Sequence, residues 1–156
     1  MEFVERETGY RLDPLPRIIV DRERMSKDWS GSASVFAYVP QASFSAFSGE
    51  PIVYLDHTRY MPGTSQWNAA IVHELVHYGQ YLTYMAAVRA GPAAVTELRS
   101  RKGWVCTRST EIEATNAEIR YLRNHDPVYA RRMEAVNLAE YSACVSGYKP
   151  TLFGRP

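Results

Sequence analysis

The chain has 156 residues, of which 46% are hydrophobic and 22% are charged, and its net charge at pH 7 is +1. This length and composition are typical of one globular domain, and the near-neutral charge gives no electrostatic reason to expect binding to nucleic acid or to an acidic membrane surface. No apolar run reaches the roughly 20 residues that a membrane-spanning helix needs, so no membrane association is expected either.

The first third of the chain is predicted to form short strands. The runs 17–21, 35–39 and 51–56 are rich in β-branched and aromatic residues, and prolines lie beside or within each of them. The stretches 30–34 and 43–49 contain serine and glycine and are expected to form the turns between the strands.

The hydrophobic period changes to that of a helix after residue 63. Apolar residues then recur every three or four positions, which predicts one long helix from about 65 to 89, with an N-cap at 64 or 65 and an end at Gly91-Pro92. Three further helices are expected, over 93–101, 109–124 and 127–145, and residues 148–156 are expected to form an irregular tail. Strands followed by helices indicate an α+β fold, with a small sheet backed by helices.

The long predicted helix contains the segment His73-Glu74-Leu75-Val76-His77. Histidines four positions apart lie on one face of a helix, where two imidazoles can reach the same ion. The segment is the HExxH motif of zinc hydrolases, in which the histidines bind Zn²⁺ and the glutamate is the general base. His73 and His77 are therefore predicted metal ligands, and Glu74 is the predicted catalytic residue. The alternative is a pair of helix-surface histidines, which the apolar setting of the segment disfavours.

A catalytic zinc site needs a third protein ligand and one open position. The long helix lacks the third histidine of the metzincin motif, so a carboxylate on the helix 109–124 is expected. Helical phase places Glu111 at the edge of the apolar side, whereas Glu113 is expected to point outward and to form a capping box with Thr110. Glu111 is therefore the predicted third ligand, with Glu113 as the alternative. Glu118 shares the face of Glu111 and is either a hydrogen-bond partner of a ligating histidine or an exposed carboxylate.

Two segments resemble zincin-like HExxH metallopeptidases of gluzincin type. Residues 72–80 read VHELVHYGQ and residues 111–114 read EIEA, which is similar to small bacterial and phage zincin domains with HELVHxxQ and a later ExEA. The resemblance covers residues 52–122 and implies the same ligands and base: His73, His77, Glu111 and Glu74. Membrane zincins that process CAAX proteins carry a comparable ExEAD segment, but Thr115 replaces its aspartate here.

The resemblance implies a single minimal zincin-like domain over residues 1–156. Its small sheet of three or four mostly antiparallel strands would pack on the HExxH helix and on further C-terminal helices. The implied function is a zinc-dependent metallopeptidase that hydrolyses peptide bonds by attack of a zinc-bound water. The implied partner is a polypeptide substrate. It either pairs with the edge strand 51–56 or leaves this segment as a sheet strand without a role in substrate binding. The alternatives are a zinc-binding or protein-binding module without turnover and a non-peptide zinc amidase.

The remaining features bear on the compartment and on structural roles. The N-terminus lacks the apolar stretch of a signal peptide, and Cys106 and Cys144 are interpreted as ordinary thiols, with one bridge as the alternative. A cytoplasmic location is therefore expected, although a phage particle or secretion without a signal peptide is compatible with the same features. His57 is expected in a loop, and His125 at the end of a helix.

Overall fold

The computed structural model describes residues 1–21, 23, 37–38, 51–56, 58, 61–106 and 108–146. Within this part the elements follow in the order α1, β1, β2, β3, α4, α5, α6 and α7. Helices and strands occur together, so the predicted α+β class is confirmed. Some of the expectations concern residues outside the described part of the chain: both serine-containing turns, His57, most of the run 35–39 and the tail 148–156.

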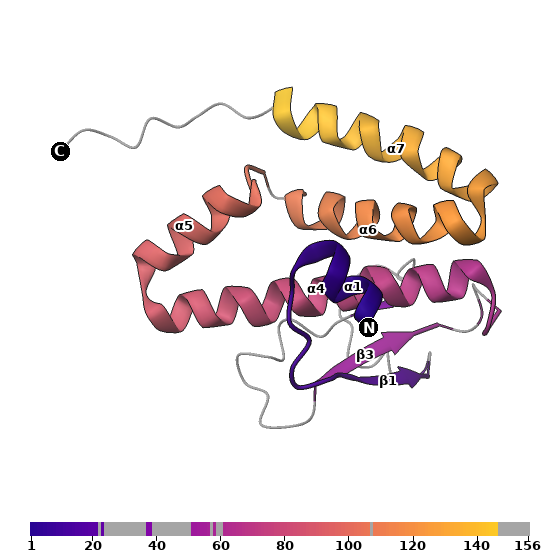
Figure 1. Ribbon diagram of the computed structural model, residues 1–156, viewed down its shortest axis with the longest axis horizontal. Helices are drawn as coiled ribbons and strands as arrows, with labels where there is room; N and C mark the ends of the chain where they lie inside the picture. Colours follow the sequence, from indigo (N-terminus) through magenta and orange to yellow (C-terminus); the bar gives the residue numbers. More distant parts are fainter. Residues whose placement is uncertain are drawn as a thin grey trace.

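Three long helices lie side by side in successive layers (Figure 1): α4 (Ser65–Ala90), α6 (Ser109–His125) and α7 (Pro127–Ser146). Helix α5 (Pro92–Lys102) leads the chain from the end of α4 back to the start of α6, so that α6 runs antiparallel to α4. The strands lie on the opposite side of α4 from α6 (Figure 1). Helix α4, which carries the HExxH motif, therefore forms the layer between the sheet and the other helices.

The sheet has the strand order β1-β3-β2, with β1 at Arg17–Val20, β2 at Ala37–Tyr38 and β3 at Ile52–Leu55. Strand β1 pairs in parallel with β3 from Arg17↔Ile52 to Val20↔Leu55, whereas β2 pairs antiparallel over two residue pairs only. The prediction of a mostly antiparallel sheet is therefore wrong. Some thirty residues separate β1 from β3, which is long enough for the crossover that parallel neighbours require.

The strand order also shows that the segment 51–56 is not the edge strand that was expected. Strand β3 is the central strand of the described sheet, with partners on both sides, and all four of its residues are buried. Val53 and Leu55 pack into the main core, while Ile52 and Tyr54 pack against Ile19 on the other face. A continuous apolar run is the pattern of a strand covered on both faces, so this segment does not have the free edge that substrate pairing needs.

A short helix, α1 (Glu2–Thr8), precedes the strands and was not predicted. Glu2 and Glu5 lie in its first turn, where negative side chains interact favourably with the helix dipole. Gly9 ends it in a left-handed conformation with φ of 71°. Val4, which is fully buried, anchors the helix in the main core, so tertiary packing stabilises a helix too short to be stable alone.

The main core joins α1, the segment after it, β3, α4 and α6. Tyr10 packs closely on Gly79 of α4, where an added Cβ atom would stand 2.6 Å from the Cβ atom of Tyr10. A side chain at position 79 would push the buried Tyr10 away from the helix, which explains why a glycine occurs inside α4 despite its low helix propensity.

Both ends of α4 match the predicted caps. The Thr64 hydroxyl accepts a hydrogen bond of 3.2 Å from the backbone N–H of Trp67, and Gly91 follows the last residue of α4. The carboxylate of Asp126 accepts a bond of 3.0 Å from the N–H of Tyr129 at the start of α7. The Nδ1 atom of His125 lies 2.8 Å from the carbonyl oxygen of Tyr121, as expected for a histidine in a last helical turn.

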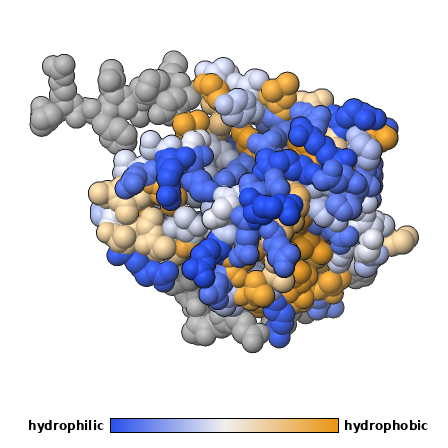
Figure 2. All heavy atoms as spheres, in the orientation of Figure 1, coloured by the Kyte–Doolittle hydropathy of each residue, from blue (hydrophilic) through white to orange (hydrophobic). Residues whose placement is uncertain are grey.

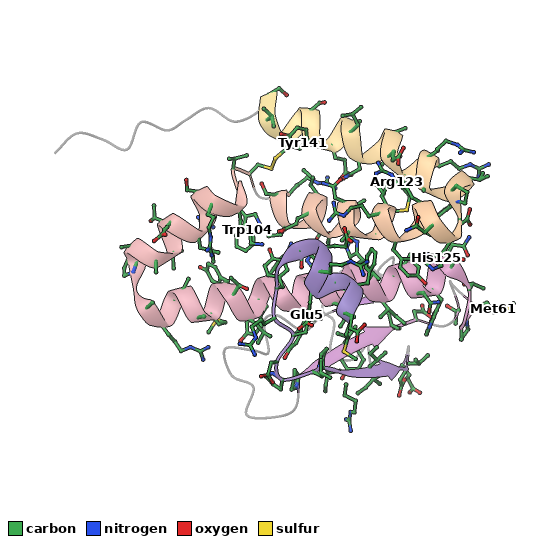
Figure 3. The ribbon with its side chains drawn as sticks, viewed as in Figure 1. Glu5, Met61, Trp104, Arg123, His125 and Tyr141 are labelled. Carbon is green, nitrogen blue, oxygen red and sulfur yellow. A yellow bond between two sulfur atoms is a disulfide. The ribbon has the colours of Figure 1, made fainter. Side chains whose placement is uncertain are left out.

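The interpretation of the two cysteines as thiols is wrong, because Cys106 and Cys144 form a disulfide with 5.8 Å between their Cα atoms. The bond joins the connection before α6 to the last turns of α7 and is visible in Figure 3. Antiparallel packing of α6 and α7 brings the two residues together although 38 positions separate them. The expectation of a cytoplasmic location rests partly on the interpretation of the cysteines as free thiols. With a disulfide in place, the cysteines no longer favour that location.

Hydrophilic and hydrophobic side chains alternate over much of the face shown in Figure 2. Hydrophobic side chains gather over the strands, where β1 leaves Ile18 and Val20 partly exposed. Among the described residues, no helix has both the length and the apolar character needed to cross a bilayer.

Candidate metal centre

Helix α4 brings the imidazoles of His73 and His77 together. Their Nε2 atoms are 3.0 Å apart, and both rings are largely buried, with 18% and 8% of the side chains exposed. The four-residue spacing places both side chains on the face of α4 that meets α6. Two ring nitrogens therefore converge on one point, as the HExxH pattern predicts.

Glu111, in the first turn of α6, completes a group of three. Its Oε2 atom lies 3.5 Å from Nε2 of His73 and 3.3 Å from Nε2 of His77. The side chain is 52% exposed, so the group is buried on the histidine side and open to solvent on the carboxylate side. The predicted third ligand is thus the carboxylate that lies beside the two histidines.

The three distances of 3.0, 3.3 and 3.5 Å define a nearly regular triangle of one oxygen and two nitrogen atoms. Neighbouring ligands around a tetrahedral zinc ion, with metal–ligand distances of about 2.0–2.1 Å, are separated by roughly 3.3 Å. One small divalent cation can therefore contact all three atoms without large side-chain movements. The group could hold a metal ion, and it is open to solvent on the side of Glu111.

Each histidine has a second partner that orients its ring. The Nδ1 atom of His73 lies 3.0 Å from Oε2 of Glu118, and the Nδ1 atom of His77 lies 2.8 Å from Oε1 of Gln80. When Nδ1 donates a proton to an oxygen, the neutral ring presents the lone pair of Nε2, as a metal ligand requires. Glu118 is itself buried, so the predicted hydrogen bond to the histidine is confirmed and the exposed alternative is wrong.

Glu113 does not have the position that helical phase predicted. It forms no cap, because α6 begins after Arg108 without any side-chain capping bond, and its own side chain is only 23% exposed. Its Oε2 atom instead accepts hydrogen bonds from Tyr10, Trp104 and Gln80. The N-terminal segment and the connection between α5 and α6 cover this side of α6, so the face that was expected to be exposed is an interior polar site.

Glu74 follows the first histidine on α4 and is buried, with 7% exposed. Burial raises the pKa of Glu74 above its usual value; the nearby His73 and His77 oppose this shift, while Glu111 and Glu118 add to it. A buried carboxyl group close to two imidazoles and two other carboxylates is well placed to exchange a proton within the site.

The pKa values of His73 and Glu111 are also strongly shifted. Burial disfavours protonation of His73, but hydrogen bonds to Glu111 and Glu118 and the charge of Glu74 outweigh it and raise the pKa of His73 to about 10. Hydrogen bonds from His73 and His77 hold the pKa of Glu111 well below its usual range. In the metal-free chain, His73 is therefore expected to be protonated at neutral pH, with one N–H facing Glu118 and the other facing Glu111.

Metal binding is expected to release this proton. Because the pKa of His73 is raised to about 10 in the metal-free chain and a ligating histidine must be neutral, affinity should rise with pH by up to about tenfold per unit across the neutral range. Calorimetric titration with Zn²⁺ at pH 7.5, in buffers of different ionisation enthalpy, should show about one proton released per ion. A binding enthalpy that is the same in all buffers, together with an affinity unchanged between pH 6.5 and 8, would contradict a protonated His73 in the metal-free chain.

Sequence reasoning missed three residues around the centre: Gln80, Tyr10 and Trp104. Gln80 carried a signal, because it stands three positions after His77 and therefore on the same face of α4. Tyr10 and Trp104 carried none, since they approach Glu113 from segments distant in the sequence. Trp104 lies between the end of α5 and the first turn of α6 (Figure 3).

The assignment of the centre rests on the sequence and the geometry of this chain. Comparisons with protein-family models, with curated proteins and with solved structures give no significant match.

Proposed function

We propose that the chain is a zinc-dependent metallopeptidase with a minimal zincin-like domain. The observation that carries the proposal is the triangle formed by Nε2 of His73, Nε2 of His77 and Oε2 of Glu111 beside the buried Glu74. Two histidines and one carboxylate are the protein ligands of catalytic zinc sites of the thermolysin type, which keep a fourth position for water or substrate. The solvent-exposed side of Glu111 gives such a position access.

Zinc is favoured over magnesium or calcium by the ligand atoms. Imidazole nitrogen suits zinc and other late transition metals, whereas magnesium and calcium prefer sites made of oxygen alone. Two of the three ligand atoms here are nitrogens, and the triangle matches a tetrahedral arrangement. Both histidines have a second hydrogen bond at Nδ1, which is the usual arrangement around a zinc-ligating histidine.

The chemistry follows from these positions. A bound zinc ion supplies a Lewis acid that polarises a carbonyl group and lowers the pKa of water to about 7. Glu74 takes a proton from the attacking water as its oxygen bonds to the carbonyl carbon, and delivers that proton to the amine as the C–N bond breaks. Glu118 and Gln80 hold the two imidazoles in place throughout.

The class of substrate rests on the resemblance of the HELVHxxQ and ExEA segments to zincin peptidases. Pairing of a peptide with strand β3 is not part of the proposal, since that strand already has partners on both sides. A polypeptide would therefore approach from the exposed side of Glu111 by contacts other than those with β3.

Purified protein loaded with Zn²⁺ is expected to cleave members of a mixed peptide library, as followed by mass spectrometry. Removal of the metal with a chelator should abolish cleavage, and added Zn²⁺ should restore it. Cleavage that survives complete metal removal would refute the proposal. Stable zinc binding without cleavage of any peptide would instead favour a zinc-binding or protein-binding module, and cleavage of small amides alone would favour an amidase.

A further inference from the structure

The amide of Gln80 connects the metal centre to the partly buried polar site around Glu113. Its Oε1 atom lies 2.8 Å from Nδ1 of His77, while its Nε2 atom lies 2.9 Å from the carbonyl oxygen of Thr110 and 3.1 Å from Oε2 of Glu113. Gln80 itself is buried, with 3% exposed. The side chain therefore bridges α4 and α6 directly behind one of the candidate metal ligands.

The orientation of this amide follows from its partners. The carbonyl of Thr110 and the carboxylate of Glu113 are both acceptors, so the group that faces them must be the NH₂ group, which has two donors. The amide oxygen then faces Nδ1 of His77, and that nitrogen must carry a proton in order to donate. In the neutral ring, which is the form that can bind a metal, the lone pair is consequently on Nε2, the atom 3.0 Å from Nε2 of His73.

Glu113 holds the amide in this orientation. Its Oε2 atom accepts bonds of 2.7 Å from the Tyr10 hydroxyl and 3.0 Å from Nε1 of Trp104, and its Oε1 atom lies 3.5 Å from Nζ of Lys102. These groups come from the N-terminal segment, the connection after α5 and the end of α5 itself. Tyr10 is fixed by its close packing on Gly79, and Nζ of Lys102 lies 3.8 Å from the centre of the Tyr10 ring.

We propose that Gln80 and Glu113 are positioning residues that set the tautomer and orientation of His77, and that the N-terminal segment acts on metal affinity through Tyr10. The proposal deepens the function proposed above and rests on the same metal centre. Glu113 also joins α6 to α4, to α5 and to the N-terminal segment. A test of its role at the metal centre therefore needs a readout that a purely structural role would not change.

The first experiment compares Gln80→Met with Gln66→Met. Gln66 is the matched control, since it is on the same helix and bonds to Asp126 rather than to the centre. Zn²⁺ affinity, measured by competition with a chromophoric chelator, should fall about 10–100-fold in Gln80→Met and stay unchanged in Gln66→Met. In the metal-free wild-type protein, the ¹⁵N chemical shifts of the His77 ring should correspond to one tautomer. In metal-free Gln80→Met they should correspond to a mixture of both tautomers. Wild-type affinity and unchanged ring shifts in Gln80→Met would overturn the proposal.

The second experiment tests whether Glu113 and Tyr10 affect zinc affinity through Gln80. Glu113→Gln and Tyr10→Phe should each lower Zn²⁺ affinity in the wild-type background and have no further effect in the Gln80→Met background. Equal losses in both backgrounds would contradict an action through Gln80. Tyr10→Phe removes only one hydroxyl and guards against a folding defect of Glu113→Gln. A wild-type protein that binds no zinc would refute the proposed function. The ring shifts are measured without metal, so they would still test whether Gln80 sets the tautomer of His77.

Discussion

Replacing His77 with alanine is expected to lower the affinity of the chain for Zn²⁺ by at least about 100-fold. Loss of an outer partner of a ligand already lowers affinity about 10–100-fold, and His77 would supply one of the three ligand atoms of the proposed centre. His73→Ala should have a similar effect. Competition with a chromophoric chelator at fixed pH measures both, and the folded state of each variant can be verified by its circular dichroism.

His125→Ala is the matched control for this prediction. His125 also lies on a helix, but its ring bonds to the carbonyl oxygen of Tyr121 and stacks on the Tyr121 ring, away from the centre. Its loss should leave zinc affinity unchanged. Equal affinity of His77→Ala, His125→Ala and the wild type would show that the zinc is bound elsewhere.

Replacing Glu74 with glutamine is expected to reduce peptide cleavage by about 100- to 10,000-fold while one zinc ion remains bound. The amide has nearly the same size as the carboxyl group but cannot take a proton from water. Glu74 contributes no atom to the ligand triangle, so metal affinity should change far less than in the histidine variants. Rates measured at saturating zinc separate the two effects.

Glu134→Gln serves as the control for this change. Glu134 pairs with Arg123 on the far side of α6 from α4 and is partly exposed, so its replacement should leave cleavage at the wild-type rate. Full cleavage by the Glu74→Gln variant would exclude Glu74 as the general base. Loss of both zinc and cleavage in that variant would assign Glu74 to metal binding.

The helical part of the fold was predictable because its signals are local. Period, caps and glycine or proline stops placed all four helices after residue 64 to within a few residues of their observed bounds. The ligand triangle was predictable for a related reason. His73 and His77 lie on the same helix, and Glu111 is the carboxylate of α6 that lies beside both of them, although the phase argument that favoured it was wrong about Glu113.

The errors concern contacts between segments distant in the sequence. Phase alone could not show that Tyr10 and Trp104 cover the face of α6 on which Glu113 lies. Strand direction depends on the path between β1 and β3, and the disulfide on the antiparallel packing of α6 and α7. Helix α1 has too few apolar residues for a periodic signal, and its stability depends on the burial of Val4 in the main core.

X-ray absorption at the zinc edge of the loaded wild-type protein tests the metal centre most directly. One zinc per chain is expected, with two imidazole nitrogens at about 2.0–2.1 Å and a carboxylate oxygen at about 2.0–2.2 Å as neighbours. The same spectrum should lose one imidazole in His77→Ala and stay unchanged in His125→Ala. Zinc surrounded by oxygen atoms alone, or a spectrum that is the same in His77→Ala, would contradict a centre formed by His73, His77 and Glu111.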